Sequence, residues 1–477
     1  MLKTRIAPSP TGKFHIGTAR TALFNYLYSK NQEGKFVIRI EDTDKIRSTK
    51  ESENDILKGM AWLGLNPDEG ATLEGEIGDY GPYRQSERTE IYKQYLEILL
   101  ERGLAYWDNT TKEELDELNQ EAKDKKETLV FRPKSRYEKL APDEKSVIRF
   151  KVENQIIRFE DKIKGKIEFD TSLLSDFVIA KSLMEPLYNF VVVIDDELMQ
   201  ITHIIRGEDH ISNTPKQILI NKALDFSRKN YAHLPLILAP DRSKMSKRFG
   251  ATSVDEYIEA GYLPEALINF LALLGWNEGN DREDYSISEL IQKFSLKRVQ
   301  KSGAVFNIEK LDSINSKYIK KLLDQDKIRF AKEFLQKSIN KDLLNLEEDK
   351  LQKLILMECN RIKKFSDLGN GLEFLVKEID YDKNILIWKD MKEIKIVKNL
   401  KWCYNIITNT EESRFEEIEN IIKSELNKNN LNFGEYLWPL RVCLSGKSQS
   451  PSPFEIINII GKKESINRID KAINKFR

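Results

Sequence analysis

The first fifty residues alternate between strand and helix patterns, and this alternation constrains the fold more than any other feature of the chain. After the loop RIAPSPTGKFHIGT at residues 5–18, apolar residues recur at helical spacing between 19 and 27, and KFVIRIEDTD at 35–44 has the pattern of a strand. Such a succession indicates a βαβ unit. We therefore predict an α/β protein with a Rossmann-like parallel sheet, whose ligands bind beyond the carboxyl ends of the strands, near Glu41.

The region from 105 to 172 has a different pattern. TKEELDELNQEAKDKKE predicts a charged helix that begins with a capping box of Thr111 and Glu114. SVIRFKV and IIRFEDKIKGKIEF then predict short strands of a small antiparallel sheet. We expect this region to be an α+β insertion that separates two halves of the parallel domain.

The second half of the parallel domain is expected at residues 173–250. LYNFVVVIDD and ITHIIRG are almost continuous β-branched runs, which predict strands buried on both faces. A helix follows, for which we expect Thr214 as the cap and Pro215 at the first position. Including the first half at 1–104, the parallel domain is thus predicted from two separate parts of the chain.

Beyond residue 250 no further strand is predicted. LPEALINFLALLGW predicts a helix that starts at Pro264 and ends before Gly275. Further amphipathic helices are predicted for LQKLILMECNRIKKF, EIKIVKNLKWCYNII, RFEEIENIIKSELNK and PFEIINIIGKKESINRIDKAINKF. The chain is therefore expected to end in an all-α region, with one helical domain at 251–320 and a second at 321–477.

Net charge says little about the function of the chain, whereas its cysteines indicate the cellular compartment. The 77 basic residues balance the 77 acidic ones, so net charge argues neither for nor against a nucleic acid, which binds to a local basic face. Cys359, Cys403 and Cys443 lack the spacing of a metal site and are expected as free thiols in a reducing compartment. No apolar run is long enough for a membrane span and MLKTRIAP has no leader pattern, so a cytoplasmic protein is expected.

The opening loop has the residue types of a phosphate site. Gly12 and Gly17 allow the backbone to approach a ligand, and a helix that begins near Gly17 would present unpaired N–H groups and its positive dipole end. His15 can donate one more hydrogen bond to a phosphate oxygen. The pattern alone is weak evidence, because Pro-Ser-Pro-Thr-Gly is also ordinary turn chemistry.

A second cationic segment follows the later strands. KMSKR at 244–248 places three cations and a hydroxyl in a polar stretch, which alone would equally suit a solvated charge run. HIGT near the N-terminus, followed by KMSKR after a second set of strands, is a paired signature that rarely arises by chance. Together the two segments indicate a site for a polyanion.

These motifs resemble those of class I aminoacyl-tRNA synthetases, and specifically of the bacterial-type glutamyl-tRNA synthetases. The resemblance extends through RIAPSPTGKFHIGTARTALFNYL, FVIRIEDTD, PLYNFVVVIDDELMQITHIIRGEDHISNTPKQILI, GYLPEALINFLALLGW, LRVCLSGKSQSP and NRIDKAI. It implies an ATP-dependent ligase that activates L-glutamate and transfers it to tRNA(Glu), or in a non-discriminating form also to tRNA(Gln). It further implies that the insertion binds the acceptor stem, that 251–320 contacts the stem and that 321–477 binds the anticodon.

The resemblance also implies site residues. His15, Lys244 and Lys247 are implied in catalysis at the triphosphate. The ATP site is implied to comprise Pro10, Thr11, Gly12, His15, Gly17, Thr18, Lys244, Met245, Ser246, Lys247 and Arg248. The glutamate site is implied to comprise Arg5, Ala7, Ser9, Glu41, Tyr188 and Arg206. Glu208, Asp209 and His210 are candidates for contacts with ATP or the 3' end of tRNA.

Some of these residues have plainer interpretations. A guanidinium binds a side-chain carboxylate with two parallel hydrogen bonds, which suits Arg5 and Arg206 to a glutamate substrate. Arg206 could instead pair with Glu208 or Asp209, and Glu41 could pair with its neighbour Arg39. The sequence EDH could simply cap the following helix, and His203 and His233 are interpreted as structural.

The chain departs from the family pattern at two places. Many members carry a cysteine zinc site near 100–125, but GLAYWDNTTKEELDELNQEAKD has neither Cys nor His, so no zinc is expected. Phe249 follows KMSKR where family members often have His. Magnesium is expected as the counterion of ATP, with no metal site of the protein's own, and a monomer is expected.

Two other classes of function remain open from the residues alone. A small-molecule nucleotidyltransferase shares a His/Gly phosphate loop on a parallel sheet, although a long helical region has no function in such an enzyme. A non-catalytic RNA-binding relative would have lost its motifs, whereas His15, Lys244 and Lys247 are all present. A shorter tRNA-modifying relative would lack the C-terminal helical region.

Overall fold

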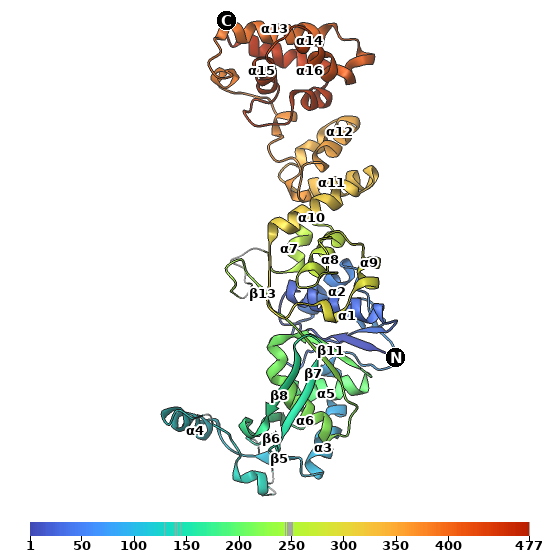
Figure 1. Ribbon diagram of the computed structural model, residues 1–477, viewed down its shortest axis with the longest axis vertical. Helices are drawn as coiled ribbons and strands as arrows, with labels where there is room; N and C mark the ends of the chain where they lie inside the picture. Colours follow the sequence, from blue (N-terminus) through green and yellow to red (C-terminus); the bar gives the residue numbers. More distant parts are fainter. Residues whose placement is uncertain are drawn as a thin grey trace. The chain divides into compact units, whose positions relative to one another are not determined.

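The computed structural model describes residues 1–127, 129–138, 140, 142–143, 145–243, 245 and 251–476 (Figure 1). The chain divides into two compact units. The first comprises Met1–Glu259 and Pro264–Leu311, and the second comprises Ala260–Leu263 and Asp312–Arg477.

The first unit is built on one large sheet, as the predicted α/β class requires. Its eight strands lie in the order β4-β3-β2-β1-β11-β12-β7-β8. The strands are β1 (Lys3–Ile6), β2 (Lys35–Ile38), β3 (Glu69–Thr72), β4 (Gly75–Ile77), β7 (Ile156–Asp161), β8 (Gly165–Asp170), β11 (His203–Gly207) and β12 (Asn230–Leu234). The strands from β3 to β7 pair in parallel, and only the edge strands β4 and β8 pair antiparallel.

The strand order reverses at β1, and this positions the ligand site. From β1 the chain passes through α1 (Ile16–Asn31), which packs on β1 and β2, and enters β2 on one side of β1. On the other side β1 pairs with β11, which comes from much later in the chain. A crevice therefore opens beyond the carboxyl ends of β1 and β11, where open α/β sheets bind ligands.

The prediction of a strand for LYNFVVVIDD is wrong, because residues Tyr188–Leu198 form helix α5. The side chains from Phe190 to Asp196 are all buried, so the helix is enclosed on every side. A continuous apolar run fits a buried helix as well as a buried strand, and only the packing distinguishes them. The neighbouring prediction holds, since ITHIIRG forms β11.

The insertion contributes to two sheets and not to one. A small antiparallel sheet has the order β10-β9-β6-β5, with the strands β5 (Ala105–Asp108), β6 (Val147–Phe150), β9 (Val178–Ser182) and β10 (Glu185–Pro186). IIRFEDKIKGKIEF does not join it, which corrects the prediction. It forms the hairpin β7–β8 of the large sheet, because Asp161 pairs with Tyr231 of β12 and the Phe159 ring packs on Tyr231.

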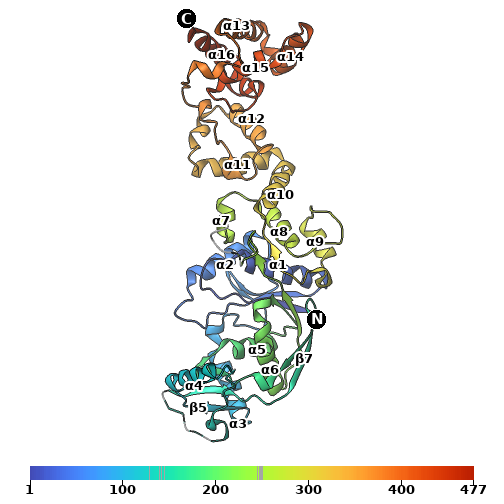
Figure 2. The ribbon, with the colours of Figure 1, turned by 60° about the vertical axis from the view of Figure 1, so that its left-hand side comes forward.

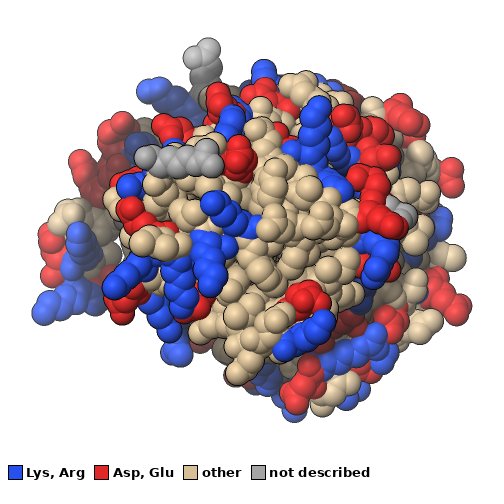
Figure 3. Space-filling model, turned by 90° about the horizontal axis from the view of Figure 1, so that it is seen from above, with Lys and Arg blue, Asp and Glu red and all other residues tan. Residues whose placement is uncertain are grey.

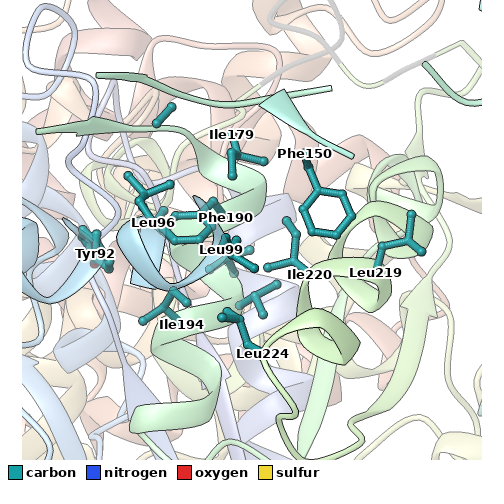
Figure 4. Packing of buried hydrophobic residues seen from close by; sticks show 14 of the residues in the cluster. Tyr92, Leu96, Leu99, Phe150, Ile179, Phe190, Ile194, Leu219, Ile220 and Leu224 are labelled. Atoms are coloured by element: carbon teal, nitrogen blue, oxygen red, sulfur yellow. The ribbon is translucent and has the colours of Figure 1, made fainter. Parts of the chain in front are cut away.

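Helices cover the sheets of the first unit. They are α1, α2 (Lys50–Trp62), α3 (Thr89–Glu101), α4 (Lys112–Asp124), α5, α6 (Thr214–Ala223), α7 (Val254–Glu259), α8 (Pro264–Leu273) and α9 (Ile287–Lys293). α5 and α6 pack against each other (Figure 2). Figure 4 shows Leu96 of α3, Phe190 of α5 and Ile220 of α6 in one buried cluster, together with Phe150 and Ile179 of the small sheet.

Several local predictions can be compared with the helix ends. Thr111 and Glu114 form the predicted capping box of α4. Thr214 is the first residue of α6 and not its cap, because a 3-10 helix at Glu208–Asn213 runs directly into it. The prediction of no strand beyond 250 is also wrong, since β14 (Ala304–Val305) pairs with β13 (Ile237–Leu238).

The second unit is helical, as predicted. Its helices are most of α10 (Ile308–Lys321), which begins in the last residues of the first unit, and α11 (Asp324–Lys337), α12 (Glu348–Cys359), α13 (Glu393–Asn409), α14 (Ile418–Lys428), α15 (Phe433–Ser445) and α16 (Pro453–Asn474). The three cysteines are buried free thiols, and burial raises the pKa of Cys359 and Cys403 to about 12. Over the described residues, no helix combines the length and the apolar character needed to cross a bilayer.

Candidate active site

A cavity of about 580 Å³ lies beyond the carboxyl ends of β1 and β11, within the usual size of small-molecule sites. It brings together many residues that the sequence analysis assigned to ATP or glutamate. These are Arg5, Ala7, Ser9, His15, Gly17, Thr18, Glu41, Tyr188, Arg206, Asp209, His210 and Met245. The sequence analysis did not identify Ile6, Pro8, Arg20, Thr21, Ile205, Gly207, Asn213, Pro235, Leu236 and Ile237, which also line it.

Four predicted site residues lie elsewhere. Pro10, Thr11 and Gly12 do not line the cavity. Glu208 is held by Lys164 and accepts a hydrogen bond from the N–H of Leu236 at 2.9 Å. Their assignment to ATP or tRNA stays a prediction.

His15 is the N-cap of α1. Its Nδ1 accepts the N–H of Gly17 at 3.0 Å, so in a neutral ring the proton is on Nε2. The N–H of Ile16 donates to Thr252 O at 2.9 Å. The expectation of unpaired N–H groups is therefore wrong for Ile16 and Gly17, because a side chain and a neighbouring loop already satisfy them.

The KMSKR segment lies largely outside the described residues, which omit Lys244, Ser246, Lys247 and Arg248. Met245 is described, and it is buried against the cavity. Its N–H donates to Ile237 O of β13 at 3.3 Å. On the C-terminal side of the segment, the N–H of Val254 donates to Phe14 O at 2.9 Å. Met245 within KMSKR is thus bonded to β13, and Val254 beyond it is bonded to the residue that precedes His15.

Arg5 and Glu41 belong to a buried ion-pair network. The Nε and Nη2 atoms of Arg5 donate to the two carboxylate oxygens of Asp196 at 3.0 and 3.2 Å. Arg39 donates to Asp196 at 2.7 Å and to Glu41 at 3.2 Å. Although burial opposes ionisation, Arg5 and Arg39 lower the pKa of Asp196 to about 2. Glu41 thus does pair with Arg39, and it also lines the cavity.

Arg206, at the carboxyl end of β11, has a different environment. Its Nε donates to His233 Nε2 at 3.2 Å and its Nη2 to Thr214 Oγ1 at 2.9 Å. Its Nη1 is buried without a hydrogen-bond partner in the described part of the chain. The alternative of an ion pair with Glu208 or Asp209 is not observed among the described residues. The guanidinium therefore keeps an unused donor at the cavity.

Tyr188 and His210 form one side of the cavity. The hydroxyl of Tyr188 lies 3.1 Å from Nδ1 of His210. Burial and the positive charge of Arg206 lower the pKa of His210 to about 4, so its ring is neutral at neutral pH. Asp209 is mostly exposed and lies 3.8 Å from His210 Nε2. This side of the cavity is therefore uncharged except at its rim.

Over the described ranges, no group of three or more His, Cys, Asp or Glu side chains is arranged to hold a metal ion. The polar groups of the cavity, with guanidiniums, two imidazoles and one buried carboxylate, suit an amino acid and a polyphosphate.

Known proteins are similar to this chain along its whole length. The family model of the catalytic domain of class I tRNA synthetases (E and Q) matches residues 1–313, and an anticodon binding domain model matches 326–473. The chain is 43% identical to glutamate–tRNA ligase 1 of Caldicellulosiruptor saccharolyticus, over 98% of each chain. It is 40% identical to glutamate–tRNA ligase of Natranaerobius thermophilus, over 100% of this chain and 99% of that one. A solved structure is also similar, the crystal structure of a glutamate tRNA ligase from Elizabethkingia meningosepticum in complex with its amino acid. Its sequence is 32% identical to this chain, and the two structures align with a TM-score of 0.87 over 100% of both chains.

Proposed function

Because the chain belongs to the glutamate–tRNA ligases of class I, we propose that it joins L-glutamate to tRNA(Glu) at the expense of ATP. The resemblance stated from the sequence is confirmed by the full-length relatives. The buried Arg206 guanidinium supports glutamate as the substrate most directly. It has an unused donor at the cavity and no acidic partner among the described residues.

The side-chain carboxylate of glutamate is assigned to Arg206, with Arg5 beside it. Arg5 has five N–H donors and uses two of its nitrogens on Asp196, so it retains donors for a ligand. Glu41 supplies the negative charge for the substrate ammonium, while Ala7, Ser9 and Tyr188 shape the pocket. Glutamine would leave the Arg206 charge desolvated and unpaired, a penalty that gives discrimination of roughly 10⁴ or more.

ATP is assigned to the side of the cavity formed by His15, Gly17, Thr18 and Met245. The Nε2–H of His15 suits a phosphate oxygen, and the positive end of the α1 dipole adds to the attraction. Lys244 and Lys247 are assigned to the triphosphate, with Ser246 and Arg248 beside them. The placement of Met245 in the cavity wall supports this assignment.

The reaction needs no nucleophile from the protein. An oxygen of the glutamate α-carboxylate attacks the α-phosphorus of ATP, the new O–P bond forms, and the bond to pyrophosphate breaks. A hydroxyl of the terminal tRNA ribose then attacks the acyl carbon, and AMP leaves. The residues contribute by positioning the reactants and by stabilising the charge that shifts onto pyrophosphate. Magnesium enters with ATP as part of that substrate, and zinc has no role.

For tRNA we propose the acceptor stem on 105–172, further stem contacts on 251–320 and the anticodon on 321–477. The match of an anticodon binding domain model to 326–473 supports the last of these. The face in Figure 3, at the α13 end of the chain, has basic and acidic side chains interspersed around a central uncharged area. Binding there would depend on the placement of individual cations and not on a uniform field.

We further propose that the protein acts as a cytoplasmic monomer. Its buried free cysteines suit a reducing compartment. Sedimentation across a hundredfold range of concentration tests the monomer.

The decisive experiment is glutamate-dependent exchange of pyrophosphate into ATP, with tRNA(Glu) present. Exchange with glutamate and none with glutamine is expected. A folded protein without exchange would eliminate the ligase. Exchange that persists unchanged after deletion of residues 321–477, in the absence of tRNA, would favour a small-molecule nucleotidyltransferase.

The alternative that the enzyme also charges tRNA(Gln) requires a separate measurement. Charging of purified tRNA(Glu) and tRNA(Gln) with glutamate distinguishes a discriminating from a non-discriminating ligase.

A further inference from the structure

Arg206 stands at the end of a buried chain of hydrogen bonds that begins at Asp161. The Nδ1 of His233 lies 2.6 Å from Asp161 Oδ2, and the Nε2 of His233 accepts the Nε–H of Arg206 at 3.2 Å. The side chains of Asp161 and His233 are fully buried. Asp161 ends β7 and His233 lies on β12, so three adjacent strands supply the three side chains.

The direction of each hydrogen bond in this chain is determined. Although burial opposes it, hydrogen bonds from His233, Ile163 and Lys164 hold the pKa of Asp161 below its usual value, and the carboxylate accepts. Nδ1 of His233 therefore carries the ring proton. Burial lowers the pKa of His233 despite Asp161, so Nε2 has no proton and can accept from Arg206.

Several other buried arginines of this unit pair with carboxylates, whereas Arg206 does not in the described part of the chain, and neither does buried Arg20, which donates to the backbone carbonyls of Leu274 and Pro235. Arg5 and Arg39 pair with Asp196, and Arg88 pairs with Asp195 at 2.7 Å. Arg206 is instead held by an imidazole nitrogen and by the hydroxyl of Thr214, neither of which is charged. Among the residues that the structure describes, no carboxylate forms an ion pair with it. Its orientation is fixed while its positive charge is not neutralised.

We propose that His233 is a specificity-determining positioning residue, which holds the Arg206 guanidinium through an uncharged acceptor so that its charge is available to the substrate's side-chain carboxylate. This inference rests on the proposed function, and it revises the interpretation of His233 as merely structural. A carboxylate in place of the imidazole would orient Arg206 equally well but would neutralise it. Preference for an acid over an amide would then be lost.

Two single variants test the positioning. His233→Phe keeps a ring that can stack on Tyr231 but removes the acceptor, while Asp161 retains its backbone donors. His233→Gln keeps an uncharged acceptor. The matched control is His203→Phe, at the other end of β11 and outside the cavity. The full-length proteins are assayed by pyrophosphate exchange with tRNA(Glu), and folding is checked by thermal denaturation.

The expected pattern is specific to one substrate. His233→Phe should raise the KM for glutamate about 10- to 100-fold, the range of one hydrogen bond to a charged group, and change the KM for ATP less than about twofold. His233→Gln should recover most of the loss, and His203→Phe should change neither constant. A glutamate KM that stays within twofold in folded His233→Phe, or equal losses in the Phe and Gln variants, would overturn the proposal.

A separate experiment tests whether the uncharged acceptor keeps the positive charge of Arg206 available to the substrate. The double variant Asp161→Asn/His233→Glu places a carboxylate on Arg206 with an amide behind it. Its preference for glutamate over glutamine, taken as the ratio of kcat/KM, should fall at least tenfold below that of His233→Gln. An unchanged ratio would overturn this part. If wild-type protein showed no glutamate-dependent exchange at all, the proposed function would fail first, which separates the two results.

Discussion

Replacing Asp196 by asparagine should destabilise the first unit strongly, although the two side chains have nearly the same shape. The carboxylate is almost fully buried and accepts three hydrogen bonds, two from Arg5 and one from Arg39. In Asp196→Asn the charge disappears, and the new amide N–H groups face guanidinium N–H groups. Removing one member of a buried ion pair costs about 3–5 kcal/mol, because the partner charges remain buried.

Hydrogen exchange followed by mass spectrometry can localise this loss. At about 1.4 kcal/mol for each factor of ten, peptides that cover β1 and β11 should exchange about 10²- to 10⁴-fold faster, while peptides of α13 to α16 serve as an internal reference. Asp209→Asn is the matched control, because that side chain is 62% exposed, and it should change exchange less than about threefold. Acceleration of less than tenfold in Asp196→Asn would refute the reasoning that this carboxylate neutralises both arginines.

The other predictions concern the site, its acid stability and one helix contact. Arg206→Ala should raise the KM for glutamate about 10²-fold with little change in the KM for ATP, and an unchanged glutamate KM would return Arg206 to a structural role. Lys247→Ala should lower the rate of activation with modest change in tRNA affinity, because it acts on charge that appears late in the reaction; Lys45→Ala is an exposed control, and unaltered turnover would contradict the assigned role. The pKa of Asp196 is lowered to about 2 from 3.8, so its contribution to stability is complete above about pH 4 and is lost as the pH falls toward 2; the fall in Tm over this range should be smaller in Asp196→Asn than in wild type, and parallel curves would contradict the assignment. Gly59→Ala should lower stability by about 1–3 kcal/mol, because the added methyl group would overlap the buried Phe14 ring; exposed Lys58→Ala is the control in thermal denaturation, and an unchanged Tm would show that the ring can move aside.

The local features of the chain were predictable where local chemistry decides them. The capping box at Thr111 and the helix that starts at Pro264 depend on a few neighbouring residues, and both are confirmed. The convergence of Arg5, His15 and Arg206 on one cavity follows from strand ends and family motifs. The first two predictions needed no knowledge of which distant segments meet, whereas the third depended on the resemblance to a known family.

The wrong predictions for residues 156–169 and 187–196 share one cause, which is that they depended on packing partners far away in the sequence. VVVI at 191–194 is apolar on every side, and its period does not distinguish a helix from a strand. The association of β7 with β12 depends on Asp161 meeting His233, 72 positions further along the chain. Asp196 is 191 positions from Arg5. No local pattern in the sequence indicates either pair.

The hairpin β7–β8 has a consequence for protein engineering and for evolution. It lies within the predicted insertion but forms one edge of the large sheet, and its last residue in β7 supports His233. Exchanging residues 105–172 between relatives as a module would therefore also replace Asp161, which supports His233 behind the proposed amino-acid pocket. If the acceptor stem binds where we propose, chimeras made at 105 and 155, which leave the hairpin with its host, should alter tRNA contacts without altering amino-acid selection.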